Sequence, residues 1–350
     1  MRDIGKIKLT AESTIRDALV VIDSGAVKFA IVVDEEDRLI GTLTDGDIRR
    51  SLLAGKELES SIRDIYFREP TVANIRNTKK EIINICTAKK IYQVPIVDDA
   101  GKVVSIDILD ELLKPEVHPN KVVLMVGGLG TRLKPLTNVT PKPMLHVGGK
   151  PILETIVENF AGYGFTNIVM CVNYKSQIIQ DYFGDGSQYG VKIEYIFEEN
   201  QMGTAGALSL LPEPLTDPFF VMNGDLLTKV NFEHMLDFHL SGKATATMGV
   251  REYDFQVPYG VVNIMDGQIQ SIEEKPVHKF FVSAGMYILD PECIDLIPQS
   301  EFYDMPTLFE KMIALGLNTT SFPLREYWLD IGRIEEYEKA NREYGQVFDA

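Results

Sequence analysis

Two kinds of hydrophobic pattern divide the chain. In the first third, short apolar runs such as Ala30–Val33 and Val94–Val97 are each followed by an acidic turn, a second apolar run and a helical stretch. Further on, apolar strands alternate with amphipathic helical stretches, at 121–125, 152–163, 167–172, 176–183 and 192–197. Strands that alternate with helices indicate a parallel sheet covered by helices. The pattern therefore predicts an α/β protein with two folded units.

The first unit contains an internal repeat. Ser13 and Asn77 begin corresponding helical stretches, and Asp34 and Asp98 end corresponding strands, each pair being 64 positions apart. A unit this small needs a partner to bury its apolar face, so the two copies are expected to form one domain. Pro115 and Pro119 then interrupt helix formation. We expect a first domain at 1–114, a linker at 115–119 and a second domain at 120–350.

The repeated unit resembles a tandem pair of cystathionine-β-synthase (CBS) motifs. The resemblance implies a regulatory domain that binds an adenine nucleotide or a pathway metabolite, and a homo-oligomer, since such pairs often associate face to face. It also implies that Thr44 and Asp47 hold the ribose of that ligand. The same offset places Ile108 and Glu111 in the second copy, so at most one standard ribose site is expected. Alternatively, Thr44 and Asp47 only cap the following helix.

The strongest local signal is a buried strand at 122–126 that leads directly into a glycine-rich loop. Gly127, Gly128 and Gly130 allow backbone amides to approach an anion closely. The loop lacks the last glycine of the Rossmann pattern Gly-x-Gly-x-x-Gly, and it lacks the Gly-Lys-Ser/Thr that ends a P-loop. It is followed instead by two cations, Arg132 and Lys142, which favours a triphosphate clamp.

The charge of the chain makes those cations important. With 51 acidic and 35 basic residues the net charge is −16, which argues against nucleic acid as a partner. A nucleoside triphosphate would meet an unfavourable average field. A phosphate site must therefore rely on local cations and a metal ion.

The run Gly-Gly-x-Gly-Thr-Arg-Leu-x-Pro-Leu-Thr, followed by Pro-Lys-Pro-Met, resembles the signature of the sugar-1-phosphate nucleotidyltransferases. The resemblance covers about residues 120–347 and implies a Rossmann-like fold of the GT-A type with a mostly parallel central sheet. It implies that Arg132 and Lys142 stabilise the transferring phosphoryl group. The implied nucleotide-binding residues are Met125, Gly127, Gly128, Gly130, Thr131, Arg132, Glu198, Gln201, Gly203 and Thr204.

Later segments match the same family in the expected order. Phe220-Val-Met-Asn-Gly-Asp225 and Trp328-Leu-Asp-Ile-Gly332 match the segments that carry its magnesium ligands, which implies Asp225 and Asp330 here. Isolated aspartates would instead be turn or cap residues. The implied sugar-phosphate-binding residues are Asn223, Tyr259, Gly260, Glu274, Lys275 and Gly285. Among these, Glu274 would contact sugar hydroxyls and Lys275 the sugar phosphate.

The segment from Glu198 to Gly206 bears on the choice of base. It resembles the guanylyltransferase branch, and a carboxylate is a natural acceptor for the two adjacent donors of guanine. Gln201 could instead read uracil or thymine through its amide. We therefore expect GMP transfer from GTP to a hexose 1-phosphate of the mannose or glucosamine type. The alternatives are uridylyl or thymidylyl transfer to glucose 1-phosphate, and an inactive nucleotide sensor.

Composition also bears on the compartment. The sequence has no apolar run near the roughly 20 residues that cross a bilayer, and its N-terminus lacks a secretory pattern. Cys86, Cys171 and Cys293 are scattered and odd in number, so each is expected to be a small buried hydrophobe. We expect a cytoplasmic protein without a membrane partner.

Overall fold

The computed structural model describes residues 4–25, 29–212 and 214–348. The outer ends of the predicted domains, Met1 and Ala350, lie outside these residues. By its contacts the chain divides into two compact units, Met1–Pro115 and Glu116–Ala350. The boundary falls at the first proline of the predicted linker.

Unit 1 is built from two similar halves. The first half contains β1 (Lys8–Thr10), α1 (Ile15–Gly25), β2 (Phe29–Val33), β3 (Leu39–Thr44) and α2 (Asp45–Leu53). The second contains β4 (Ala73–Asn74), α3 (Lys79–Lys89), β5 (Gln93–Val97), β6 (Val103–Ile108) and α4 (Leu109–Leu112). Each half forms a three-stranded sheet whose first two strands are parallel and whose last two are antiparallel.

The repeat predicted from the sequence recurs in the hydrogen bonds. Asp34 Oδ1 accepts bonds from two backbone amides of its turn, at 2.9 Å each, and Asp98 Oδ1 does the same in the second half. The two turns meet, since the amide of Leu39 donates to the carbonyl of Gly101 at 3.0 Å. One hydrophobic cluster combines Phe29, Ile31 and other residues of the first half with Val103 and Ile106 of the second. Each half therefore buries part of its apolar face against the other.

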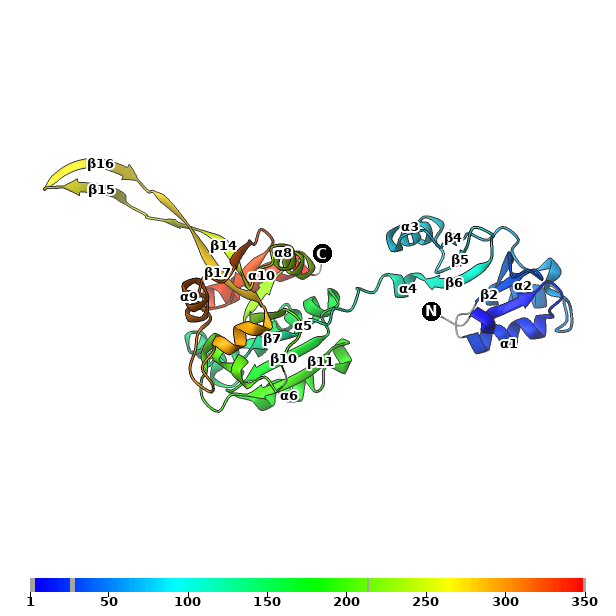
Figure 1. The fold of residues 1–350 in the computed structure, drawn as a ribbon, viewed down its shortest axis with the longest axis horizontal. Helices are drawn as coiled ribbons and strands as arrows, with labels where there is room; N and C mark the ends of the chain where they lie inside the picture. Colours follow the sequence, from blue (N-terminus) through cyan, green and yellow to red (C-terminus); the bar gives the residue numbers. More distant parts are fainter. Residues whose placement is uncertain (1–3, 26–28, 213, 349–350) are drawn as a thin grey trace. The chain divides into compact units, whose positions relative to one another are not determined.

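Unit 2 is a seven-stranded sheet with helices on both faces (Figure 1). Its strands are β7 (Val122–Met125), β10 (Asn167–Val172), β11 (Lys192–Phe197), β12 (Phe219–Asn223), β14 (Ala246–Gln256), β17 (Val277–Leu289) and β18 (Thr319–Pro323). The helices are α5 (Ile152–Gly162), α6 (Ser176–Phe183), α7 (Gly203–Gly206), α8 (Phe232–Ser241), α9 (Met305–Ala314) and α10 (Ile334–Phe348).

The strand order is β11-β10-β7-β12-β17-β14-β18, and β17 is antiparallel to both of its neighbours while the other adjacent pairs are parallel. Alternate residues of β7 pack on opposite faces, as the period of a strand requires. Val122 and Leu124 join a cluster that contains Phe160 of α5, whereas Val123 joins one that contains Leu308 of α9. The α/β fold with a largely parallel sheet is confirmed.

Two features lie beside this sheet. Short ladders are formed by β8 (His146–Val147) with β9 (Lys150–Pro151), and by β13 (Leu226–Thr228) with β19 (Trp328–Asp330). In addition, β14 and β17 continue beyond the sheet as a two-stranded ribbon, which ends in the hairpin of β15 (Gly260–Met265) and β16 (Gln268–Glu274). Figure 1 shows this ribbon projecting from the sheet.

The three cysteines are free and buried, as predicted. Burial raises the pKa of each thiol, that of Cys293 to about 12. In the parts of the chain that the structure describes, we find no helix with the length and apolar character needed to cross a bilayer.

Candidate active site

The glycine-rich loop follows β7 at the carboxyl edge of the parallel strands. Gly130 has a φ of 61°, and a Cβ there would lie 2.9 Å from Lys142 Cβ and 2.9 Å from Thr137 Cγ2. The Thr137 hydroxyl donates to the carbonyl of Gly130 at 2.9 Å. A glycine at this position therefore allows the loop to pack directly on the 3₁₀ turn Lys142–Met144, which carries the predicted phosphate-binding lysine.

A first cavity of about 240 Å³ opens beside this loop. Seven of the predicted nucleotide-binding residues line it, namely Met125, Gly127, Gly128, Glu198, Gln201, Gly203 and Thr204. Asn223 and Asp225 line it as well. Of the other predicted residues, Gly130, Thr131 and Arg132 continue the loop outside the cavity wall. Met202 and Phe302 also line the cavity, and neither was predicted.

Glu198 is held at the wall of this cavity by its neighbours. One carboxylate oxygen accepts the backbone amide of Met202 at 3.1 Å, and the Asn173 side chain donates to the Glu198 carbonyl at 2.6 Å. The other carboxylate oxygen faces Gly127, where a Cβ would come within 2.8 Å of it. Burial raises the pKa of Glu198, and the amide of Met202 opposes that rise. The site thus presents a fixed acceptor to whatever enters the cavity.

The two predicted metal ligands are brought together by the short β13–β19 ladder. In its register Leu226 lies opposite Asp330, and the amide of Ile331 donates to the carbonyl of Asp225 at 3.1 Å. Asp225 follows β12, which pairs with β7, so the ladder ties the late aspartate to the glycine-rich loop. Two carboxylates that are far apart in the sequence therefore face one region.

Lys142 forms an ion pair with Asp225 Oδ2, and only 11% of the lysine side chain is exposed. Asp225 Oδ1 is buried and has no hydrogen-bond partner. Among the residues that the structure describes, Glu336 Oε2 is the other buried side-chain atom in this state. Leaving a buried oxygen unpaired is costly, and such an atom at a cavity is a place for a ligand or an ion.

Glu336 is a site residue that sequence reasoning missed. Charged groups surround Gly332, where a Cβ would lie 3.6 Å from Glu336 Oε2, 3.8 Å from Asp330 Oδ1 and 3.9 Å from Arg132 Nη1. Glu336 lies in the first turn of α10, where an acidic side chain is ordinarily interpreted as stabilising the helix dipole. Its one signal in the sequence was its closeness to the motif that ends at Gly332.

The environment of Asp330 is strongly anionic. Burial raises its pKa, and the nearby Asp225 and Glu336 carboxylates raise it further, while Lys142 and Arg132 oppose the rise. Mg²⁺ is commonly held by one or two carboxylates together with substrate phosphates and waters. The Asp225 and Asp330 carboxylates, with one oxygen left unpaired, fit that requirement. No cluster of three or more metal-binding side chains occurs within the described residues.

A second cavity of about 340 Å³ shares Thr204 and Asn223 with the first. It is lined further by Leu226, Ser283, Ala284, Gly285, Tyr287, Asp304, Pro306, Trp328 and Asp330. Two predicted sugar-phosphate-binding residues, Asn223 and Gly285, are therefore in its wall. Asp304, which sequence reasoning missed, accepts the amide of Thr204 at 3.1 Å and so fixes the wall between the cavities.

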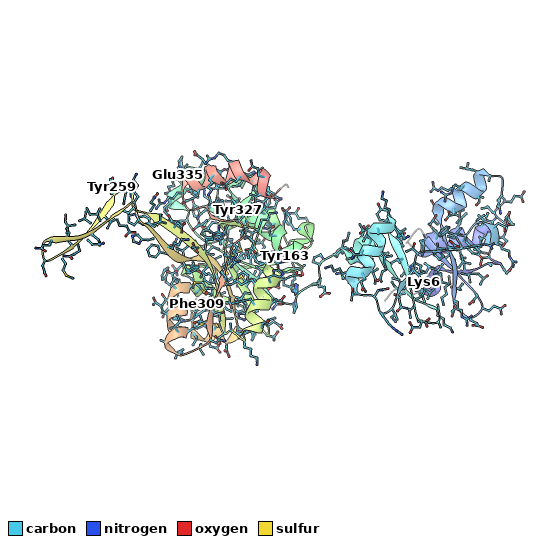
Figure 2. The ribbon with its side chains drawn as sticks, turned by 90° about the horizontal axis from the view of Figure 1, so that it is seen from above. Lys6, Tyr163, Tyr259, Phe309, Tyr327 and Glu335 are labelled. Carbon is cyan, nitrogen blue, oxygen red and sulfur yellow. The ribbon has the colours of Figure 1, made fainter. Side chains whose placement is uncertain are left out.

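The other predicted sugar-phosphate-binding residues are not part of this site in the structure. Tyr259, Gly260, Glu274 and Lys275 lie on the projecting ribbon, and Tyr259 is 74% exposed. None of them lines either cavity. Figure 2 shows Tyr259 on the ribbon, apart from the body of unit 2, where Phe309 and Tyr327 lie.

In unit 1, Thr44 and Asp47 form a capping box at the start of α2. The Asp47 carboxylate accepts the amide of Thr44 at 2.8 Å and its hydroxyl at 2.6 Å, and it pairs with Arg50 at 2.5 Å. Ile108, at the corresponding place in the second half, makes no side-chain cap. The capping role is thus present, while a ribose contact remains a prediction.

Known protein families match a part of each unit. The nucleotidyl transferase family matches residues 121–347, and the CBS domain matches residues 2–54. The chain belongs to the nucleotidyl transferase family and carries an N-terminal CBS domain, which confirms the resemblance to both families. The CBS match covers the first of the two predicted copies.

Individual relatives differ in the substrates that their names give. A mannose-1-phosphate guanyltransferase of Candida albicans is 35% identical over 234 residues, or 62% of each chain. A UTP–glucose-1-phosphate uridylyltransferase of Synechocystis is 34% identical over 63% of this chain and 62% of the relative. The match thus spans less than two thirds of the relatives' length. The structure of HddC from Yersinia pseudotuberculosis complexed with GMP-PN has a TM-score of 0.51 and 27% identity, covering 64% of this chain and 99% of that one.

Proposed function

We propose that the protein transfers a nucleotidyl group, GMP from GTP, to a hexose 1-phosphate of the mannose or glucosamine type. The products are a nucleotide sugar and pyrophosphate. One observation carries the proposal: the two cavities share Thr204 and Asn223, Asp225 lines the first and Asp330 the second, and Lys142 pairs with Asp225. A junction of two substrate cavities is where a bond between two substrates would form.

The chemistry follows from the charges of the substrates. A sugar 1-phosphate, as a phosphate monoester with a second pKa of about 6, is mostly dianionic near neutral pH and needs no general base. One of its oxygens forms a bond to the α-phosphorus of the triphosphate. The bond from that phosphorus to the bridging oxygen breaks, and pyrophosphate leaves with the electron pair. The protein must align these atoms and reduce the repulsion between two anions.

Lys142 and Arg132 serve that purpose from the loop side. The Lys142 ammonium is largely buried, so its charge acts through little solvent. Asp225 and Asp330 would hold Mg²⁺, which when bound offsets negative charge on the phosphates. The ion pair with Asp225 restrains the Lys142 side chain. Arrival of the phosphates gives Lys142 a new anionic partner.

Guanine is the base that the first cavity supports best. The Glu198 carboxylate is fixed at the wall and can accept two donors of one base edge. The relatives named as mannose-1-phosphate guanyltransferases agree with this choice. The uridylyltransferase relative, and Gln201 in the same cavity, favour uracil as the second candidate.

Unit 1 is proposed to regulate the transfer by binding an adenine nucleotide or a pathway metabolite. The family of its N-terminal domain and the separate compact form of this unit support that role. The three buried free thiols suit a reducing compartment, so we place the reaction in the cytoplasm.

The test is a matrix of GTP, UTP, dTTP, ATP and CTP against mannose, glucosamine and glucose 1-phosphates, with Mg²⁺ and the full chain. Pyrophosphate release is expected to be fastest with GTP and a mannose- or glucosamine-type acceptor. Faster release with UTP and glucose 1-phosphate would replace the guanine assignment by the uracil one. Release from no pair would make the protein a sensor.

A further inference from the structure

The projecting ribbon is the least covered part of unit 2. We call residues 251–282 the arm: the outer parts of β14 and β17 together with β15 and β16. Six large apolar side chains on the arm are at least 65% exposed, namely Tyr259, Ile264, Met265, Ile269, Ile272 and Phe281. Phe280 and Phe281 are neighbours in one strand, so both faces of the ribbon are apolar. An isolated two-stranded ribbon is marginally stable in water, and an apolar patch of this kind indicates a binding surface.

The predicted sugar-phosphate-binding residues of the arm, Tyr259 with Gly260 and Glu274 with Lys275, lie opposite each other on its two strands. Gln256 pairs with Val277 on the near side and Gly260 with Glu274 on the far side. Between these pairs both strands are interrupted at a proline, Pro258 and Pro276. Lys275 takes a left-handed conformation there, with a φ of 48°. The residues that resemble sugar-phosphate ligands therefore sit at a built-in break in the ribbon.

While the ribbon is intact, Lys275 at this break cannot reach the second cavity of the same chain. Ser283 lines that cavity, and the ladder from Ser283 paired with Val250 runs without a gap to Val277 paired with Gln256. Six residues of extended strand span about 20 Å at roughly 3.3 Å each, which is far more than a lysine side chain can reach. Lys275 lies beyond the end of that ladder.

The second cavity, for its part, lacks a cation. Its described lining includes two carboxylates, Asp304 and Asp330, and no lysine, arginine or histidine. The charged side chains of this lining are therefore all negative, and Lys142 and Arg132, which act on Asp330, lie outside it. The arm supplies the missing charge as the exposed Lys275, and it supplies Glu274 as an acceptor for hydroxyls. Cavity and arm are thus complementary in charge.

We propose that two copies of this chain exchange their arms, so that the arm of each lies over the second cavity of the other and Lys275 completes the partner's site. The inference rests on the proposed function. In a reciprocal exchange each arm contacts the other copy, as the symmetry of a two-fold dimer requires. The exchange also covers both apolar faces of each ribbon. The sugar phosphate is then held between a core from one copy and an arm from the other.

Complementation between two defective copies tests this arrangement. Lys142→Ala removes the cation of the core and Lys275→Ala that of the arm, and each homodimer should lose about 100-fold or more of its turnover. Co-expressed with different tags and purified as a hybrid, the pair has one intact site of two when arms are exchanged. The hybrid should then recover about half of the wild-type turnover. Recovery of none would show that each arm serves its own core, and full turnover of the Lys275→Ala homodimer would remove the arm from the site; either result overturns the proposal.

A second readout does not depend on turnover. Light and isotopically heavy full-length chains, each with Tyr259→p-benzoylphenylalanine, are produced separately, mixed by joint unfolding and refolding, and irradiated. Cross-links from position 259 to peptides of the second cavity should join light to heavy chains. Links within one isotope class only would overturn the exchange. If the wild type releases no pyrophosphate from any substrate pair while mixed links form, the proposed function fails and the exchange stands.

Discussion

Lys142→Ala separates the chemical role of this lysine from its role in folding. The Lys142 side chain is 11% exposed and pairs with the Asp225 side chain, which is 22% exposed. Removing a preorganised charge from a transferring phosphoryl group costs about 2.7–4 kcal/mol, or about 10²–10³-fold in kcat. The variant should therefore lose turnover by that factor, with a smaller change in KM. Pyrophosphate release under saturating substrates measures it.

The effect on stability should be modest. A hydrogen bond to a charged group contributes about 1.5–3 kcal/mol, and for a domain of this size about 1 kcal/mol shifts Tm by roughly 2–4 °C. Loss of Lys142 leaves Asp225 and Asp330 without their nearest cation, so Mg²⁺ should raise the Tm of the variant more than that of the wild type. Lys150→Ala, which removes the lysine paired with Glu158, is the control and should leave turnover nearly unchanged. Normal kcat in the Lys142 variant, or a change in KM alone, would refute the assignment.

Three further substitutions probe the site. Gly130→Ala should lose about 1–3 kcal/mol of unfolding free energy in urea, because its φ is 61° and Lys142 Cβ lies 2.9 Å from the new Cβ. The control is Gly149→Ala, where φ is 91° and the new Cβ meets open space, so that it measures the backbone effect alone. Burial raises the pKa of Glu198, so its ionised form opposes folding. Glu198→Gln should then be more stable than wild type near pH 8, an advantage that disappears near pH 4, and should discriminate less between GTP and UTP. Asp330→Asn should remove the rise of Tm that Mg²⁺ produces and lower turnover at least about 100-fold; an unchanged response to Mg²⁺ would argue against Asp330 as a ligand.

Much of the fold could be predicted because local sequence patterns determine it. Apolar strands that alternate with helices gave the parallel sheet, and the repeat at 64 positions reappears as two similar turns around Asp34 and Asp98. The loop residues were found for a similar reason. A buried strand followed directly by Gly127 and Gly128 is a local pattern that predicts a phosphate-binding loop. The pairing of that strand with β12 places the loop at the first cavity.

What the sequence could not show depends on contacts between distant segments. Glu336 and Asp304 look like ordinary residues at helix N-termini. Only the packing of those helices brings Asp304 to the second cavity and Glu336 close to Asp330. The arm is the larger case. Its motifs resemble sugar ligands residue by residue, yet the place of Lys275 depends on how far the β14–β17 ladder continues beyond the sheet. The length of that ladder is set by pairing across the ribbon.

The central claim is that the two cavities bind two substrates that become joined at the α-phosphorus. Product analysis by mass spectrometry, with GTP, a hexose 1-phosphate and Mg²⁺, tests it most directly. Equal amounts of pyrophosphate and a nucleoside diphosphate sugar are predicted, and neither should form when one substrate is omitted. Release of orthophosphate, or of pyrophosphate without the nucleotide sugar, would contradict the account.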